Sequence, residues 1–185
     1  MKKFILSIAV TALVFNVSAQ KSSSDDQPLK FSIGIEAALP LGDFGKVSSF
    51  GIGGTAQVDY TIKESLAVTL NAGYISFSGK STTIPAYSIG GVTVPATTIK
   101  YGNVGYIPVL AGVKYSFTDA LYGSAQLGLT IASASGGGES SSTFTYAPGV
   151  GYKFTENIDA LLKYTGYSAN GGSTSTIGLR VAYTF

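Results

Sequence analysis

From Lys30 to the end of the sequence, apolar residues alternate with small or polar residues, and no apolar run is long enough for a spanning helix. Such alternation places every second side chain on the same face of a β-strand, so it predicts strands that are apolar on one face only. Stretches rich in Gly, Ser and Asn separate the alternating segments, as connections between strands do. We predict eight strands, at about 29–39, 50–62, 66–77, 104–117, 121–132, 143–154, 158–167 and 176–185.

The alternation leaves open which face of the sheet points outward, because a soluble lipocalin-like barrel and a membrane barrel share the same period. The face opposite the apolar one carries mostly small residues with isolated charges, and only 12% of the chain is charged, against about 25% in typical soluble domains. Nearly every apolar face ends in Tyr or Phe, as expected at a membrane interface. These features favour an all-β fold, an eight-stranded antiparallel up-and-down transmembrane β-barrel.

A short motif recurs where strands end. Residues 60–66, 115–121 and 152–158 each begin with tyrosine, continue through an apolar residue to a polar turn, and end on an apolar residue. A fourth copy, Tyr183-Thr184-Phe185, ends the sequence. The other connections, at 40–49, 78–103, 133–142 and 168–175, are longer and irregular. Because outer-membrane barrels have short periplasmic turns and longer outer loops, this asymmetry predicts that both termini are periplasmic.

The first residues have the layout of a secretory signal peptide. Lys2 and Lys3 precede an apolar run, and Val17-Ser18-Ala19 forms a small-x-small cleavage site. We therefore divide the chain into a signal peptide (1–19), a flexible leader (20–28) and a barrel (29–185). Loss of residues 1–19 reduces the 12 Lys and Arg residues by two, to 10, which equals the 10 Asp and Glu residues. The exported chain then has no net charge, so no nucleic-acid partner is expected.

The sequence contains no histidine and no cysteine. Disulfides, Cys/His zinc sites, Cys nucleophiles and Ser–His catalytic pairs are therefore excluded. No phosphate-binding or calcium-binding loop pattern is present either. We expect no enzymatic activity, no cofactor, no metal site and no catalytic residue.

Several segments together resemble a known family. They are Phe31-Ser32-Ile33-Gly34, Leu39-Pro40-Leu41-Gly42-Asp43-Phe44, the Tyr-x-Phe/Ile-Thr turns and the last seven residues, 179–185. With these motifs, residues 29–185 resemble the small outer-membrane β-barrel domains of Gram-negative bacteria, the OmpA/OmpX-like and PorT-like barrels. The resemblance implies a monomer in the bacterial outer membrane, in contact with outer-membrane lipid.

The same resemblance implies a role for the last strand. In that family, an alternating final strand with a terminal aromatic residue is the insertion signal that the barrel assembly machinery reads. Here the residues in the matching positions are Leu179, Val181, Tyr183 and Phe185.

Seven ionisable residues fall on the face expected to line the lumen, namely Glu36, Asp59, Lys114, Lys153, Asp159, Lys163 and Arg180. Glu36, Lys163 and Arg180 lie at similar heights on strands that become neighbours when the barrel closes. We hypothesise that Glu36 pairs with Arg180, with Lys163 as a second partner. The other four would form a wetter ring nearer the periplasmic mouth. Because side chains just fill an eight-stranded barrel, we interpret this network as a structural core.

Three functions remain compatible with the sequence. The first is an integral outer-membrane barrel with a structural or surface-interaction role, and the second is a narrow passive pore for ions or small solutes. The third is a soluble exported barrel that binds an apolar ligand. Residues 82–98 contain alternating apolar residues, which predicts a hairpin around Gly90-Gly91 that extends two strands. This hairpin is either a strand-addition site for a protein or surface ligand or an inert extension.

Overall fold

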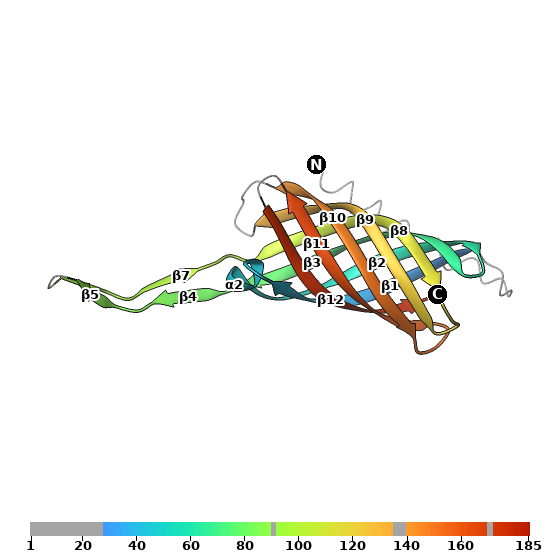
Figure 1. Cartoon of the computed structure of the whole chain (residues 1–185), viewed down its shortest axis with the longest axis horizontal. Helices are drawn as coiled ribbons and strands as arrows, with labels where there is room; N and C mark the ends of the chain where they lie inside the picture. The colour runs from blue at the N-terminus through green and yellow to red at the C-terminus, as the bar shows by residue number, and fades with distance from the viewer. Residues whose placement is uncertain (1–27, 90–91, 135–139, 170–171) are drawn as a thin grey trace, which may run out of the picture.

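The computed structural model describes residues 28–89, 92–134, 140–169 and 172–185, which form a closed antiparallel barrel (Figure 1). The strand order is β1-β12-β11-β10-β9-β8-β3-β2, so each strand pairs with the next barrel strand in the chain and β12 closes onto β1. The barrel strands are β1 (Leu29–Leu41), β2 (Ser48–Lys63), β3 (Leu66–Gly79), β8 (Val104–Ser116), β9 (Leu121–Ala134), β10 (Ser141–Lys153), β11 (Ile158–Ala169) and β12 (Gly172–Thr184). The predicted up-and-down eight-stranded barrel is confirmed.

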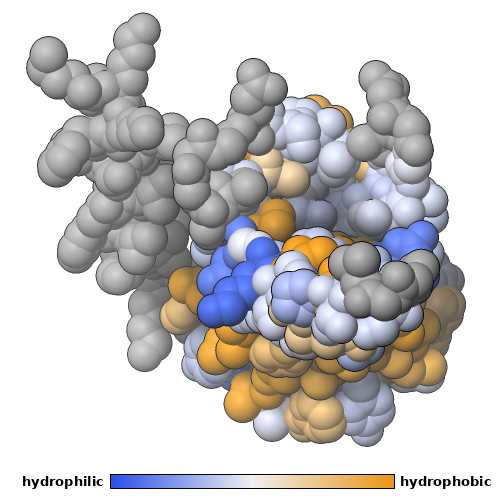
Figure 2. All heavy atoms as spheres, turned by 90° about the vertical axis from the view of Figure 1, so that its left-hand side faces the viewer, coloured by the Kyte–Doolittle hydropathy of each residue, from blue (hydrophilic) through white to orange (hydrophobic). Residues whose placement is uncertain are grey.

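The barrel wall points its apolar side chains outward. Leu70, Val109 and Leu179 are 55%, 47% and 46% exposed, whereas the inward-facing Thr69 and Asn71 are each 1% exposed. Figure 2, seen from the left-hand end of Figure 1, shows hydrophobic residues gathered over the flank of the barrel. The predicted orientation is confirmed, and an apolar interior, which the soluble ligand-binding alternative requires, is contradicted.

Two short turns at one end of the barrel have the same pattern of hydrogen bonds. After β8, the Phe117 N–H donates to the Leu121 carbonyl at 2.9 Å, and the Leu121 N–H donates to the Thr118 hydroxyl at 2.9 Å. The equivalent bonds after β10 measure 2.9 and 3.0 Å, so the sequence repeat is also a structural repeat. We call this end of the barrel, which carries turns 64–65, 117–120 and 154–157, the turn end, and the opposite end the loop end.

The aromatic residues of the motif form a girdle outside the turn end. In three copies the two aromatic rings pack edge to face, with centroids 5.2 to 5.4 Å apart. The pairs are Tyr115–Phe117, Tyr152–Phe154 and Tyr183–Phe185. Aromatic girdles of this kind mark the interface between hydrocarbon and headgroups in transmembrane barrels.

The loop end carries a short helix, α2 (Phe44–Val47), and a long two-stranded ribbon. In the ribbon β4 (Ser81–Ile84) pairs with β7 (Thr97–Lys100), and β5 (Tyr87–Ile89) pairs with β6 (Val92–Val94). Figure 1 shows the ribbon extending well beyond the barrel. The predicted hairpin is confirmed, although its tip at residues 90–91 lies outside the described residues.

Two sequence expectations differ from the structure or fall outside it. The predicted loop at 168–175 is mostly paired strand, because β11 and β12 stay in register as far as Ala169 and Gly172; small polar residues continue a ladder as well as apolar ones do. The predicted signal peptide and leader lie outside the described residues, except for Pro28. None of the helices in the described ranges is long and apolar enough to cross a membrane.

Candidate functional site in the barrel lumen

An ion pair is buried inside the barrel. The ammonium Nζ of Lys163, on β11, donates to Oε2 of Glu36, on β1, at 2.8 Å. The two side chains are only 4% and 3% exposed. Because two buried charges must compensate each other, this pair ties β11 to β1 across the closing strand β12.

Arg180 lies opposite Glu36 in the ladder between β1 and β12, yet its guanidinium bonds elsewhere. Its Nε donates to the Thr55 hydroxyl at 2.8 Å and its Nη2 to the Ser32 hydroxyl at 3.0 Å. A Cβ on Gly34 would come within 2.9 Å of Nε, so the absence of a side chain there lets Arg180 lie across β1. The hypothesis that Glu36 pairs with Arg180 is therefore wrong, and Lys163 is the partner.

Three amides form a second buried group, which we call the amide cluster: Gln57, Asn71 and Gln126. Gln126 Nε2 and Asn71 Nδ2 both donate to Gln57 Oε1, at 3.2 and 3.3 Å. All three residues are at most 6% exposed. Within the described ranges, Asn71 Oδ1 is the buried side-chain oxygen or nitrogen that has no hydrogen-bond partner. The cluster fills the lumen with polar groups that hydrogen bonds largely satisfy.

The remaining lumen charges lie toward the turn end. Lys114 Nζ forms an ion pair with Asp59 Oδ2 at 3.3 Å, and the two side chains are 15% and 14% exposed. The ammonium of Lys114 also sits 4.2 Å from the ring centroid of Tyr122, and the Tyr122 hydroxyl donates to Asp159. Together with Lys153, the two acids and Lys114 line a cavity at this end. The structure thus brings together the four residues of the expected wetter ring.

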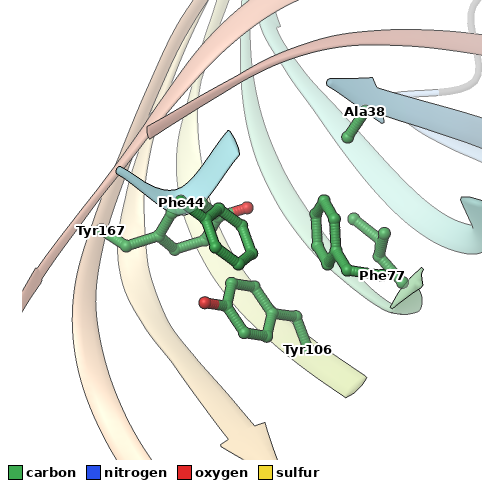
Figure 3. Close-up of a cluster of buried hydrophobic side chains, with 6 residues drawn as sticks. Ala38, Phe44, Phe77, Tyr106 and Tyr167 are labelled. Carbon is green, nitrogen blue, oxygen red and sulfur yellow. The ribbon is translucent and has the colours of Figure 1, made fainter. Parts of the chain in front are cut away.

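Aromatic side chains close the loop end, an arrangement absent from the sequence analysis (Figure 3). Phe44 of α2 inserts among Phe77, Tyr106 and Tyr167, which we call with it the aromatic plug. Ring centroids within the plug lie 5.0 to 5.7 Å apart, and all four residues are at most 9% exposed. The available signal was that the three barrel residues occupy inward positions of β3, β8 and β11.

The outer side of α2 carries an exposed ion pair. Lys46 Nζ lies 2.7 Å from Asp43 Oδ1. Hydrogen bonding and Coulomb attraction from Lys46 lower the pKa of the Asp43 carboxyl, and the same contact raises the pKa of Lys46. Since both side chains are exposed, solvent weakens this pair.

The buried lining determines what the lumen can do. A water-filled channel would leave its lining accessible to water, yet Arg180 and Gln126 are 2% exposed and Thr130 and Thr145 are 0% exposed. Side chains therefore fill the middle of the barrel. The described ranges contain no group of three or more Asp or Glu side chains placed to hold a metal ion.

The four residues predicted as an insertion signal share the outer face of the last strand. Leu179, Val181, Tyr183 and Phe185 are 46%, 46%, 48% and 64% exposed. The Phe185 N–H donates to the Phe31 carbonyl at 2.9 Å, so the ladder with β1 continues to the final residue. This end of β12 is thus fully paired in the folded barrel.

Comparisons with known proteins agree with this architecture. Ail, the attachment invasion locus protein of Yersinia pestis, is 17% identical, with a TM-score of 0.57 over 85% of this chain and 97% of Ail. The N-terminal β-barrel domain of Pseudomonas aeruginosa OprF is 17% identical, with a TM-score of 0.53 over 84% of this chain and 97% of that domain. Neisserial surface protein A is 18% identical, with a TM-score of 0.50 over 86% and 98%.

No match was found among curated proteins. The family model described as "Outer membrane protein beta-barrel domain" matches residues 7–185, which is nearly the whole chain. The closed barrel, its outward apolar face and its aromatic girdle are the features that such a family requires. The chain therefore belongs to the outer membrane protein β-barrel domain family.

Proposed function

We propose that this outer-membrane barrel is sealed, and that it supports the membrane and presents its projecting ribbon to the outside rather than conducting solutes. The observation that carries this proposal is the burial of the lumen: Arg180, Gln126 and Thr145 are at most 2% exposed. The aromatic plug adds a second obstruction at the loop end. A catalytic role is not part of the proposal, because the sequence offers neither histidine nor cysteine.

Recordings in planar lipid bilayers test the seal. The purified, refolded barrel should insert without steady conductance in symmetrical potassium chloride. A large-pore porin, recorded in the same bilayers, serves as the positive control for insertion. Reproducible open levels that scale with the salt concentration would instead support the narrow passive pore.

The proposed orientation places the turn end and both termini in the periplasm and the ribbon outside the cell. Short turns on the periplasmic side are the rule for barrels of this type, and Figure 1 shows the ribbon at the opposite end. A cysteine introduced at Ser88, in the ribbon, should react in intact cells with a maleimide that does not cross the membrane. A cysteine at Asn157, in a short turn, should react only after the outer membrane is permeabilised. The reverse pattern would invert the orientation.

The ribbon supports a surface-interaction role. Its side chains Ile84, Tyr87, Val94 and Ile99 are 37% to 50% exposed, and β4 and β7 pair only with each other within the described ranges. The outer edges of such a ribbon present free backbone groups, and strand addition is a common way for a protein to use them. We propose that the ribbon binds a protein or surface ligand.

A deletion tests the ribbon. Removal of residues 82–98 should abolish adhesion of expressing cells to a protein-coated surface that the full-length chain binds. The matched control replaces the same residues by a Gly/Ser linker of equal length, and the heat-dependent gel mobility of each variant reports whether its barrel is folded. Unchanged adhesion of a folded deletion variant would make the ribbon an inert extension.

We also propose that Leu179, Val181, Tyr183 and Phe185 form the insertion signal for the barrel assembly machinery and that the folded barrel is monomeric. The outward position of all four on one strand supports the first point. Phe185→Ala should slow assembly in cells, whereas Phe154→Ala, in another copy of the motif, should not. Light scattering of the detergent-solubilised barrel measures its oligomeric state.

A further inference from the structure

Two prolines lie inside barrel strands, Pro108 in β8 and Pro148 in β10. Proline has no N–H to donate, so within a strand that is paired on both sides it removes one ladder bond. Each proline is paired in register with β9, Pro108 with Thr130 and Pro148 with Ala125. On the other side of each proline the ladder is interrupted, between β8 and β3 and between β10 and β11.

The bond missing at Pro148 belongs to one identifiable carbonyl. At the turn end the Phe154 N–H donates to the Ile158 carbonyl, so these two residues are a hydrogen-bonded pair. Such pairs recur at every second position of an antiparallel ladder, and the register is the same on both sides of the interruption. Pro148 and Tyr164 therefore occupy a hydrogen-bonded pair, and the Tyr164 carbonyl lacks its ladder donor. The side-chain hydrogen bonds to backbone carbonyls in the described ranges end on other residues.

A groove of about 660 Å³ lies on the outer wall at this interruption; we call it the wall groove. Its volume is typical of sites for small ligands, which measure roughly 300–1,000 Å³. Small outward residues of β9 and β10 form its floor, namely Gly123, Ala125 and Pro148. Larger outward side chains, 40% to 56% exposed, flank the floor: Val113 and Tyr115 of β8, Leu162 and Tyr164 of β11, and Ile177 of β12.

The wall groove extends down to the backbone. Gly149 and Lys163 are paired next to the interruption, and both line the groove. Gly149 has no side chain, and the Lys163 ammonium points into the lumen, where it bonds Glu36. The unpaired Tyr164 carbonyl therefore lies at the floor of the groove. A backbone carbonyl without a donor is costly inside a membrane, and a molecule that enters the groove can supply the missing donor.

The wall groove lies in the part of the barrel that faces lipid. Tyr115 and Phe117, a pair of the aromatic girdle, line its turn-end margin, and such girdles mark the level of the headgroups. Tyr164 lies four residues beyond Ala160, which is paired with Tyr152 of the same girdle. Four residues of a tilted strand rise by roughly 10 Å, which places the carbonyl at the depth of the acyl chains. The groove is thus continuous with the lipid interface.

We propose that the wall groove binds an acyl chain of a membrane lipid and that it prefers a chain with a hydroxyl group near its middle. The apolar chain lies over Gly123 and Ala125 between the flanking side chains, and its hydroxyl donates to the Tyr164 carbonyl. A hydroxyl at this depth has no water to bond, so a carbonyl that the ladder leaves free distinguishes it from an unmodified chain. This inference goes beyond the proposed function and requires neither the seal nor the ribbon.

NMR of the refolded barrel in phosphatidylcholine nanodiscs tests the proposal. The signal is the carbonyl carbon of Tyr164, whose chemical shift reports an accepted hydrogen bond. The probe is a phosphatidylcholine with a stearoyl chain hydroxylated at its middle, and the matched lipid carries the hydroxyl beside the ester, at headgroup level. The probe should shift the signal saturably and bind about threefold to tenfold more tightly than the matched lipid, as expected for one hydrogen bond in a membrane.

Two substitutions have matched controls within the chain. Pro148→Ala supplies the missing N–H and should abolish the preference for the mid-chain hydroxyl. Pro108→Ala, at a buried proline that does not line the groove, should preserve it. Ala125→Phe fills the floor and should remove the saturable shift, whereas Ala56→Phe, at an exposed position of β2, should retain it. The heat-dependent gel mobility of each variant reports whether its barrel is folded.

Equal binding of the two hydroxylated lipids, or a preference that survives in a folded Pro148→Ala variant, would overturn the proposal. A Tyr164 signal that shifts without the probe when two barrels share a nanodisc would also overturn it, because a second copy of this chain would then be the occupant. A conducting barrel or an inert ribbon would refute the proposed function without changing any of these results.

Discussion

Removal of the Glu36 charge should destabilise the barrel more than removal of the Lys163 charge. Glu36→Gln leaves two buried cations, Lys163 and Arg180, with no carboxylate beside them, and an unpaired buried charge costs about 3–5 kcal/mol. Lys163→Met leaves Glu36 opposite Arg180 in the ladder, whose guanidinium can partly replace the lost ammonium. We therefore expect the free energy of unfolding to fall by about 1–3 kcal/mol. The double variant Glu36→Met/Lys163→Met should recover part of the stability that Glu36→Gln loses, since it removes the unpaired Lys163 charge but leaves Arg180 without a carboxylate.

Unfolding in urea, in phospholipid vesicles, measures these differences. The chain contains no tryptophan, so far-ultraviolet circular dichroism and gel mobility are the suitable signals. Asp43→Asn is the matched control, because it breaks an ion pair whose side chains are 79% and 91% exposed and should shift the unfolding curve far less than either lumen variant. A Glu36→Gln loss below about 1 kcal/mol, the range of exposed pairs, or a larger loss for Lys163→Met, would refute the reasoning.

Three further predictions concern the loop end and the barrel interior. Phe44→Ala should lower the free energy of unfolding by about 3–5 kcal/mol, as large-to-small changes in packed cores do, and bilayer recordings should still show no conductance because the mid-barrel stays filled. Gly151→Val should cost about 1–3 kcal/mol in thermal unfolding, because its Cβ would overlap the ring of Tyr122. NMR titration should give Asp43 a pKa below its ordinary value, and Lys46→Gln should raise it back. Because that pKa is lowered in the folded chain, the contribution of the pair is present at neutral pH and is lost as the pH falls through the lowered pKa.

The fold was predictable because period-two patterning survives almost unchanged along the chain. Thr69, between the outward Val68 and Leu70, is 1% exposed, and a similar alternation runs along most of the other barrel strands. The turn motif adds the turn ends of β2, β8, β10 and β12, since each carries a tyrosine and, two residues later on the same face, a phenylalanine or isoleucine. The weakest strand boundary was at residues 168–175, where small polar residues on both faces hide the ladder that links Ala169 to Gly172.

The partners of the lumen charges were only partly predictable. Counting along the strands correctly placed Glu36 and Arg180 at similar heights, and the structure sets them opposite each other. Register, however, fixes Cα positions and leaves long side chains several directions. Gly34 opens the path that Arg180 takes toward Ser32 and Thr55. No sequence pattern reports such a path, because it depends on which neighbour lacks a side chain at one height of the barrel.

The seam between β1 and β12 shows why these contacts matter for the whole molecule. Arg180 reaches from β12 past β1 to Thr55 on β2, and Lys163 reaches from β11 to Glu36 on β1. Both contacts therefore cross the one junction that joins the first and last strands. A one-residue slip there would turn Arg180 toward lipid, which costs about 2–4 kcal/mol at the bilayer midplane. The polar lumen thus fills the barrel and at the same time specifies the register in which the barrel closes.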